Sequence, residues 1–188
     1  TLSGESYLRP AIRIEVIDDT ETPIFGTLEL YLHVQSSRFP NDVMLTFPVN
    51  VGNLRGVTKK FMELPFEVIE GDEIIFNLVD DDTLTEEQQN IIVRACELTG
   101  YVVCVGAQIY DPAHADLIKP VVKNGAEFLG EAIVENFNEN NFDHAGSAVY
   151  IVPQSKPKNA HLANTISLVK EGLLRKYVHA KVKVFFPE

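Results

Sequence analysis

The sequence predicts a mainly β protein, an antiparallel β-sandwich with an inserted helical segment near residues 85–122. Apolar and polar residues alternate with a period of two in several segments of the first half and at the carboxyl end, which is typical of half-buried strands. Helical spacing is concentrated in one block instead of recurring between strands, which disfavours a βαβ fold. At 188 residues, we expect one domain, 1–188, in which 83–125 form the helical insertion.

The alternation is clearest in two early segments. Residues 12–16 and 28–34 place apolar side chains at every second position, and each predicts a strand. Val57–Phe66 stays ambiguous, because Pro65 argues against a central strand there. The other predicted strands are Met44–Val51, with Pro48 at an edge or bulge, and Glu73–Val79, Phe128–Val134, Ala148–Val152 and Val178–Phe186.

The helical block begins with an N-cap signal. Thr85 is followed three residues later by Gln88, and apolar residues then recur at roughly helical spacing, so we predict a helix from Glu86 to Leu98. We expect its apolar face to cover an open edge of the sandwich. The apolar segment Tyr101–Tyr110 is compatible with a second short helix or with a strand, and Asp111-Pro112 ends it.

The charge balance limits the classes of partner. The net charge is −11, from 27 acidic and 16 basic side chains, and this field repels nucleic acid and anionic membranes unless a cation or a local basic patch intervenes. We therefore expect no nucleic-acid role. Three basic clusters, Lys59-Lys60, Arg175-Lys176 and Lys181 with Lys183, are interpreted as solvated faces.

The cysteines, the apolar segments and the first residue bear on the redox state and the cellular location. Cys96 and Cys104 lack metal-type spacing, and eight residues of continuous helix would separate them by about 12 Å, so we expect buried thiols and no disulfide. No segment resembles a transmembrane helix or a signal peptide. The chain begins at Thr1 without Met, which is compatible with removal of an upstream segment and with a cytoplasmic or a secreted location.

The run Asp80-Asp81-Asp82 directly follows a predicted strand. Three adjacent carboxylates repel one another unless they are solvated or hold a cation. Alternate residues at a strand end point the same way, so Asp80 and Asp82 can face one ion. Calcium prefers six to eight oxygen ligands of this kind. The alternative is a solvated acidic loop that leads into the helix.

Two segments resemble a C2 domain. Gly71–Asp82 reads as a strand that ends in an Asp-x-Asp loop, and Ala126–Ala132, AEFLGEA, reads as the start of the next strand. The resemblance implies an eight-stranded antiparallel sandwich that binds calcium between loops at one end, and docks on phospholipids or on proteins. It implies the ligands Asp80, Asp82, Glu127 and either Asp18 or Asp19. The segment 83–125 departs from the family, because it interrupts the loop before Glu127.

These observations lead to three functional hypotheses. The first is a non-catalytic binding module that uses calcium to engage a phospholipid surface or a protein. The second is a calcium-independent structural or protein-interaction domain with the same fold. The third is a hydrolase with His and Asp residues, or with Cys104 as nucleophile and His114 or His144 as base; no catalytic motif is complete, and the valines around Cys104 favour an inert thiol.

Overall fold

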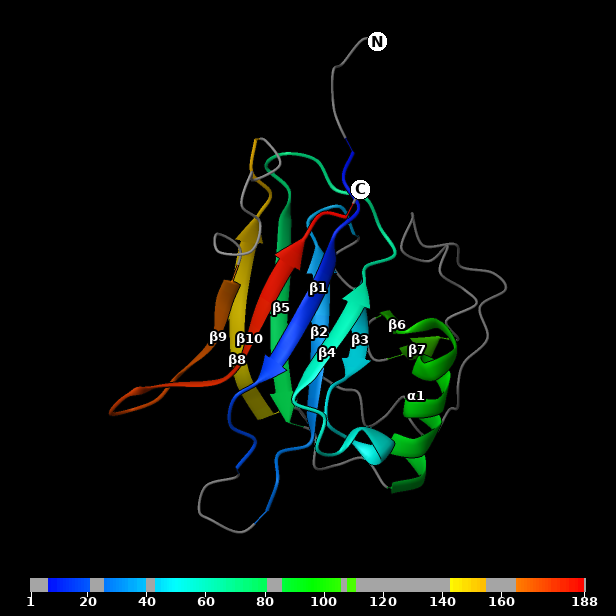
Figure 1. Cartoon of the computed structure of the whole chain (residues 1–188), viewed down its shortest axis with the longest axis vertical. Helices are drawn as coiled ribbons and strands as arrows, with labels where there is room; N and C mark the ends of the chain where they lie inside the picture. Colours follow the sequence, from blue (N-terminus) through cyan, green and yellow to red (C-terminus); the bar gives the residue numbers. More distant parts are fainter. Residues whose placement is uncertain are drawn as a thin grey trace.

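The structure is a computed structural model, and it describes residues 7–20, 26–39, 43–80, 86–105, 108–110, 143–154 and 165–187. Within these ranges the chain is mainly β, with one long helix (Figure 1). The strands are β1 Ala11–Val16, β2 Leu30–Ser36, β3 Val43–Pro48, β4 Lys59–Glu63, β5 Glu73–Asp80, β6 Val102–Val105, β7 Gln108–Tyr110, β8 Asp143–Ile151, β9 Thr165–Glu171 and β10 Lys176–Phe185. The helices are α1 Glu86–Thr99 and the short 3-10 helix η1 Gly52–Leu54.

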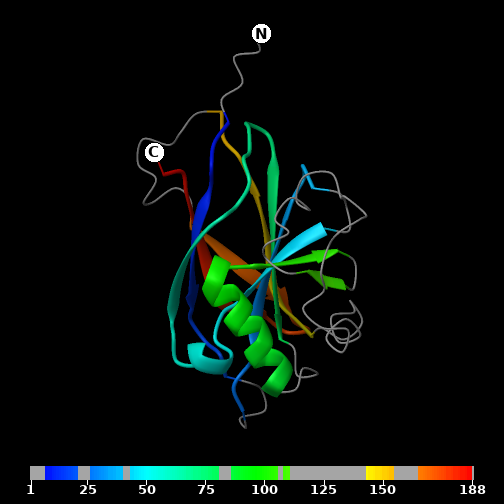
Figure 2. The same cartoon turned by 90° about the vertical axis from the view of Figure 1, so that its right-hand side faces the viewer.

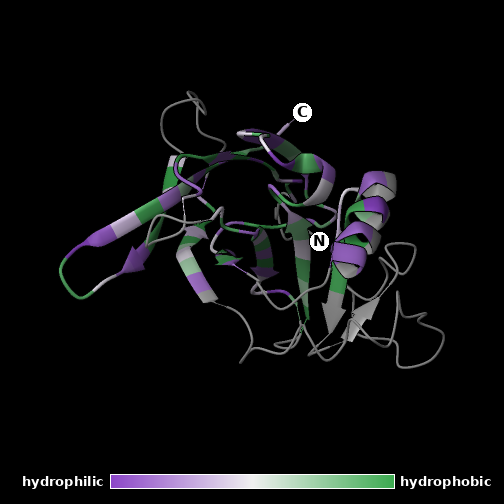
Figure 3. Cartoon of the chain, turned by 90° about the horizontal axis from the view of Figure 1, so that it is seen from below, coloured by the Kyte–Doolittle hydropathy of each residue, from purple (hydrophilic) through white to green (hydrophobic). Residues whose placement is uncertain are grey.

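The strands form one antiparallel sheet in the order β4-β1-β10-β9-β8-β5-β2-β3-β6-β7. The sheet curls, so that the β4-β1-β10-β9 half lies across from the half that contains β8, β5, β2 and β3 (Figures 2 and 3). The inner faces of both halves contribute to one hydrophobic core. Ile14 on β1, Val182 on β10, Leu32 on β2 and Phe76 on β5 are all fully buried in it. The period-two pattern of the sequence thus marks the side chains that the curl encloses.

Strands β8 and β9 connect the two halves of the sheet through a short ladder. The ladder between these strands holds one residue pair, Ser147 with Val169, whereas β5 and β8 pair over most of their length. Gly146 has a φ of 156°, and a Cβ atom there would lie 2.5 Å from the carbonyl oxygen of Leu168. A side chain at this position would therefore collide with the β9 backbone, and glycine allows the close approach at the bend.

The helix packs on the outer face of the sheet. Tyr31 on β2 joins Val51, Val79, Ile92, Val93, Cys96 and Val102 in a second buried cluster beneath α1. Consequently β2 is buried on both faces. The expectation that this helix covers an open edge was wrong, because α1 packs on a face of the sheet, and β6 and β7 extend the sheet beyond β3, with β7 at the edge (Figure 2).

Several predicted elements are confirmed and others are refined. The predicted helix Glu86–Leu98 matches α1, which ends at Thr99. The next residue, Gly100, has a φ of 92°, as is common for a glycine after a helix. The ambiguous segment Tyr101–Tyr110 contains the strands β6 and β7, so the insertion is not wholly helical. Val57–Phe66 contains the edge strand β4. The predicted strand Phe128–Val134 lies outside the described residues. No helix in the described part of the chain is long and apolar enough to cross a membrane.

Candidate functional site

One end of the sheet gathers acidic residues from separate loops. Asp18 and Asp19 follow β1, and Asp80 ends β5. The Asp80 carboxylate is buried, with 5% exposed, and its Oδ1 accepts a hydrogen bond of 2.7 Å from the Glu29 backbone N–H. Asp80 therefore holds the start of β2, in addition to any ligand role.

Asn50 links Asp19 to the same backbone. Its buried amide accepts a 2.8 Å hydrogen bond from the Leu30 N–H, and its Nδ2 donates to the Leu28 carbonyl at 2.9 Å and to Asp19 Oδ2 at 3.4 Å. Asn50 and Asp80 thus fix consecutive residues at the start of β2. The loops after β1 and β3 and the end of β5 converge there. Asn50 is not among the residues that the sequence singled out, because its role depends on contacts far apart in the chain.

Asp18 is tied to the base of the β9–β10 hairpin. Hydrogen bonds from the backbone N–H and the hydroxyl of Thr20 lower the pKa of the Asp18 carboxyl, and the nearby charge of His179 adds to this. The His179 ring Nδ1 lies 2.8 Å from the Asp18 carbonyl oxygen, and the Ile17 N–H donates to the His179 carbonyl. The loop at Asp18 and the β9–β10 hairpin are therefore joined at one end of the molecule.

The predicted calcium ligands are only partly described. Asp18, Asp19 and Asp80 lie at the same end, whereas Asp82 and Glu127 lie outside the described residues. Within the described ranges, no three His, Cys, Asp or Glu side chains form a group that could hold a metal ion. A calcium site at this end would therefore need Asp82 and Glu127 to complete it, since calcium requires at least six oxygen ligands.

The residues of the catalytic hypothesis are also dispersed or undescribed. His114 and the side chain of Cys104 lie outside the described set, so their pairing stays a prediction. Cys96 is buried and forms no disulfide, as predicted. His33 is fully buried, and burial lowers its pKa to about 4. His33 lies between Met44 and Thr46, so it is a core residue and not a solvent-exposed base.

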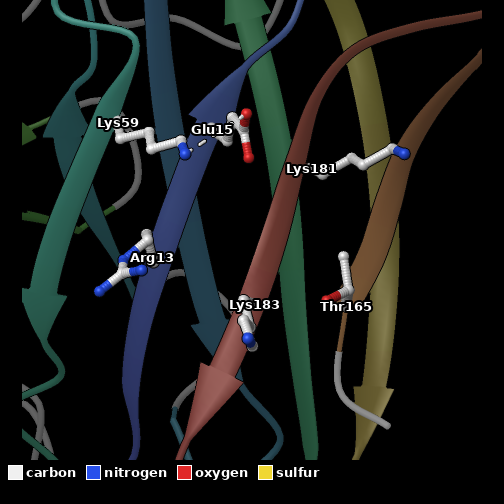
Figure 4. Close-up of a pocket in the computed structure, with 6 residues that line it drawn as sticks. All are labelled: Arg13, Glu15, Lys59, Thr165, Lys181 and Lys183. Atoms are coloured by element: carbon white, nitrogen blue, oxygen red, sulfur yellow. Dashed lines mark ion pairs between the residues drawn. The ribbon is translucent and has the colours of Figure 1, made fainter. Parts of the chain in front are cut away.

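A basic face covers the outer side of the β4-β1-β10-β9 half (Figure 4). We define the basic face as the residues around an open pocket of about 240 Å³, namely Arg13, Glu15, Lys59, Thr165, Lys181 and Lys183. Four of these residues are cations and one is an anion, which gives a formal charge of +3 (4 − 1). Lys59 Nζ lies 3.9 Å from Glu15 Oε1, and this exposed ion pair contributes little to stability.

Strand register assembles the basic face. Arg13 pairs with Lys183, and Glu15 pairs with Lys59 on one side and Lys181 on the other. Directly opposite residues point to the same side of the sheet. Phe185 adjoins the cluster: the Arg13 guanidinium and the Lys183 Nζ lie 5.6 and 5.4 Å from its ring centre. The sequence indicated only separate Lys pairs, because it does not reveal that Arg13 and Lys183 are neighbours.

Among protein-family models, curated proteins and solved structures, none matches this chain.

Proposed function

We propose that the chain is a non-catalytic binding module that engages an anionic phospholipid surface through its basic face. The observation that carries the proposal is the charge distribution. A chain of net charge −11 places Arg13, Lys59, Lys181 and Lys183 together on one side of its sheet. In a protein of this composition, an exposed strand face with average charge would carry more acidic than basic residues. The basic face has the opposite excess.

The size of the expected attraction supports a membrane surface as partner. A Lys or Arg close to an anionic leaflet contributes about 1 kcal/mol. Four cations offset by Glu15 therefore give about 3 kcal/mol, which is enough for weak, reversible association. The remaining acidic surface is repelled, so it orients the basic face toward the lipid.

Vesicle sedimentation tests this proposal. The full chain is mixed with vesicles of equal parts phosphatidylserine and phosphatidylcholine, and with phosphatidylcholine alone. We expect binding to the anionic vesicles only, and a loss of about thirtyfold in Lys181→Gln/Lys183→Gln, because two headgroup contacts of about 1 kcal/mol each are removed. The matched control is Arg9→Gln/Arg94→Gln, which removes the same charge from exposed positions elsewhere. Equal losses in both variants would show that only net charge matters, and would contradict a specific basic face.

The acidic end supports calcium as a second element of the proposal. Asp19 and Asp80 are brought to one end through Asn50 and the β2 backbone. The C2-like resemblance adds Asp82 and Glu127 as further ligands. The enclosed core between the two halves of the sheet is what a C2-like sandwich requires. Calcium bound there would neutralise an end that otherwise repels an anionic membrane or an acidic protein.

Thermal unfolding with calcium and with a chelator tests the ion site separately. A ligand that binds the native state alone raises the Tm. We expect calcium to raise the Tm of the wild type and to leave Asp80→Asn/Asp82→Asn unchanged. An equal rise in both proteins would reject the site. Vesicle binding without any calcium response would instead identify a calcium-independent module, and absence of vesicle binding would favour a protein partner.

A further inference from the structure

The turn between β9 and β10 exposes two leucines completely. Leu173 and Leu174 have relative exposures of 104% and 98%. They are the central residues of a tight turn in which the Gly172 N–H donates to the Arg175 carbonyl at 2.9 Å. The hairpin projects from the body of the protein, with an apolar tip between hydrophilic strand ends (Figures 1 and 3). The leucines therefore form a convex apolar tip that contacts no other part of the fold described.

The requirements of the turn do not explain these leucines. Two-residue hairpin loops favour Asn, Asp and Gly at the central positions, since these residues adopt the needed backbone conformations. Gly172 already meets the steric demand of this turn, because a Cβ atom there would lie 2.5 Å from the Tyr177 ring and 2.7 Å from the Arg175 carbonyl oxygen. Leucine at both tip positions departs from local preference, and such departures concentrate at functional sites.

Cations and an aromatic ring surround the apolar tip. Arg175 and Lys176 follow the leucines directly, and Lys170 is the strand partner of Tyr177. The Arg175 guanidinium lies 4.6 Å from the centre of the Tyr177 ring. Glu171 is the nearest acidic residue and pairs with Lys176 at 3.6 Å. Moving inward from the tip, the order is apolar, cationic and then aromatic.

We propose that the β9–β10 tip inserts into an anionic phospholipid bilayer. Leu173 and Leu174 enter the acyl boundary, Lys170, Arg175 and Lys176 meet the lipid phosphates, and Tyr177 lies at the interface, where tyrosine is enriched. The proposal rests on the proposed function, because it adds an inserting element to a module that already binds anionic lipid. Strand β10 connects the two features, since it also carries Lys181 and Lys183.

The convex tip and its charge favour a bilayer over a protein pocket. A bilayer accepts a projecting apolar tip without a matching cavity, and its anionic surface complements the formal charge of +2 (3 − 1) that Lys170, Arg175, Lys176 and Glu171 give together. The net charge of −11 does not prevent this contact, because charges beyond the Debye length of about 8 Å are screened at physiological salt. Hydrogen bonds between His179 and the loop at Ile17 and Asp18 anchor the base of the hairpin, so the tip is presented by a fixed support.

A tryptophan reporter tests insertion directly, because the chain contains no Trp. In Leu174→Trp the new indole lies at the tip, and in the control Ile151→Trp it lies at an exposed position on β8. With vesicles of equal parts phosphatidylserine and phosphatidylcholine, we expect a blue shift and quenching by brominated lipid for Trp at 174 only. Vesicle binding without a shift at 174 would overturn the insertion while leaving the proposed function intact. No sedimentation of any variant would overturn both.

Loss-of-function variants provide an independent test. Burial of each leucine side chain in the acyl boundary changes affinity by about tenfold, so we expect Leu173→Ser/Leu174→Ser to bind the anionic vesicles about a hundredfold more weakly. The control Val149→Ser/Ile151→Ser removes two apolar side chains of β8 that are 53% and 61% exposed, and it should bind as the wild type does. The tip leucines are fully exposed, so their replacement should leave the Tm unchanged. Equal affinity of the tip variant and the wild type would overturn the proposal.

Discussion

The acidic end and the basic face use their charged side chains in opposite ways. At the acidic end, Asp80 is buried and accepts a hydrogen bond from the Glu29 N–H. The uncharged Asn50 makes three further hydrogen bonds there, with Leu28, Leu30 and Asp19. On the basic face, Arg13, Lys59 and Lys181 extend into solvent. Lys59 forms an exposed ion pair with Glu15, and Arg13 forms a cation–π contact with Phe185. A charged group that already stabilises the fold is less available to a ligand. The side chains of the acidic end thus already stabilise the fold, whereas those of the basic face are accessible for the lipid contact proposed above.

Replacing Asn50 tests the structural role of the acidic end, and we expect it to have the largest effect on stability. In Asn50→Ala the Leu30 N–H and the Leu28 carbonyl both lose their partner in a buried setting. We expect the free energy of unfolding to fall by about 4 kcal/mol, measured by urea denaturation. Asn53→Ala is the control, because Asn53 is exposed in the neighbouring 3-10 helix η1. A change below 1 kcal/mol would mean that the acidic end does not depend on Asn50 for its shape (roughly the lower limit for one unsatisfied group).

The pH dependence of stability should follow the core more than either charged region. Burial lowers the pKa of His33 from 6.5 to about 4. The unfolded chain therefore takes up a proton first as the pH falls, so this stabilisation is complete above pH 6.5 and is lost toward pH 4.

We expect a loss of about 3 kcal/mol across that window, measured by urea denaturation at each pH. His33→Gln removes the titrating group and should flatten the profile, whereas His144→Gln should leave most of the slope. A slope that persists in His33→Gln would assign the acid sensitivity to the carboxylates of the acidic end instead.

Asp80 should contribute to stability even without a metal ion. Replacement by alanine leaves the Glu29 N–H without its carboxylate acceptor, so we expect Asp80→Ala to lower the free energy of unfolding by about 2 kcal/mol in chelator. The control Glu70→Ala removes a carboxylate at an exposed position. If Asp80→Ala matched that control, the contrast between the two regions would weaken.

The basic face should show the smallest effect on stability. Lys181 and Lys183 project outward from β10, so Lys181→Gln/Lys183→Gln should change the free energy of unfolding by no more than about 0.5 kcal/mol. The same variant should lose vesicle binding. A large loss of stability would show that these side chains support the sheet, and would remove the reason for assigning them to a partner.

The sequence predicted the strands better than it predicted their arrangement. Period-two alternation around Ile12 and Ile14 located β1, and the capping signal at Thr85 located α1. By contrast, alternation does not say which strands pair. The bend at Gly146 and the place of β6 beside β3 depend on contacts between distant segments. For the same reason, alternation does not show that Arg13 lies beside Lys183.

The sequence by itself determined the β-rich class, the helix α1 and the net charge, because these depend on local spacing and on composition. Only the tertiary structure decided which charges meet. Strand register placed Arg13 beside Lys183, and loop convergence placed Asn50 beside Asp19. It also decided that Leu173 and Leu174 are left outside the core, since a leucine is buried or exposed according to what the rest of the chain packs against it.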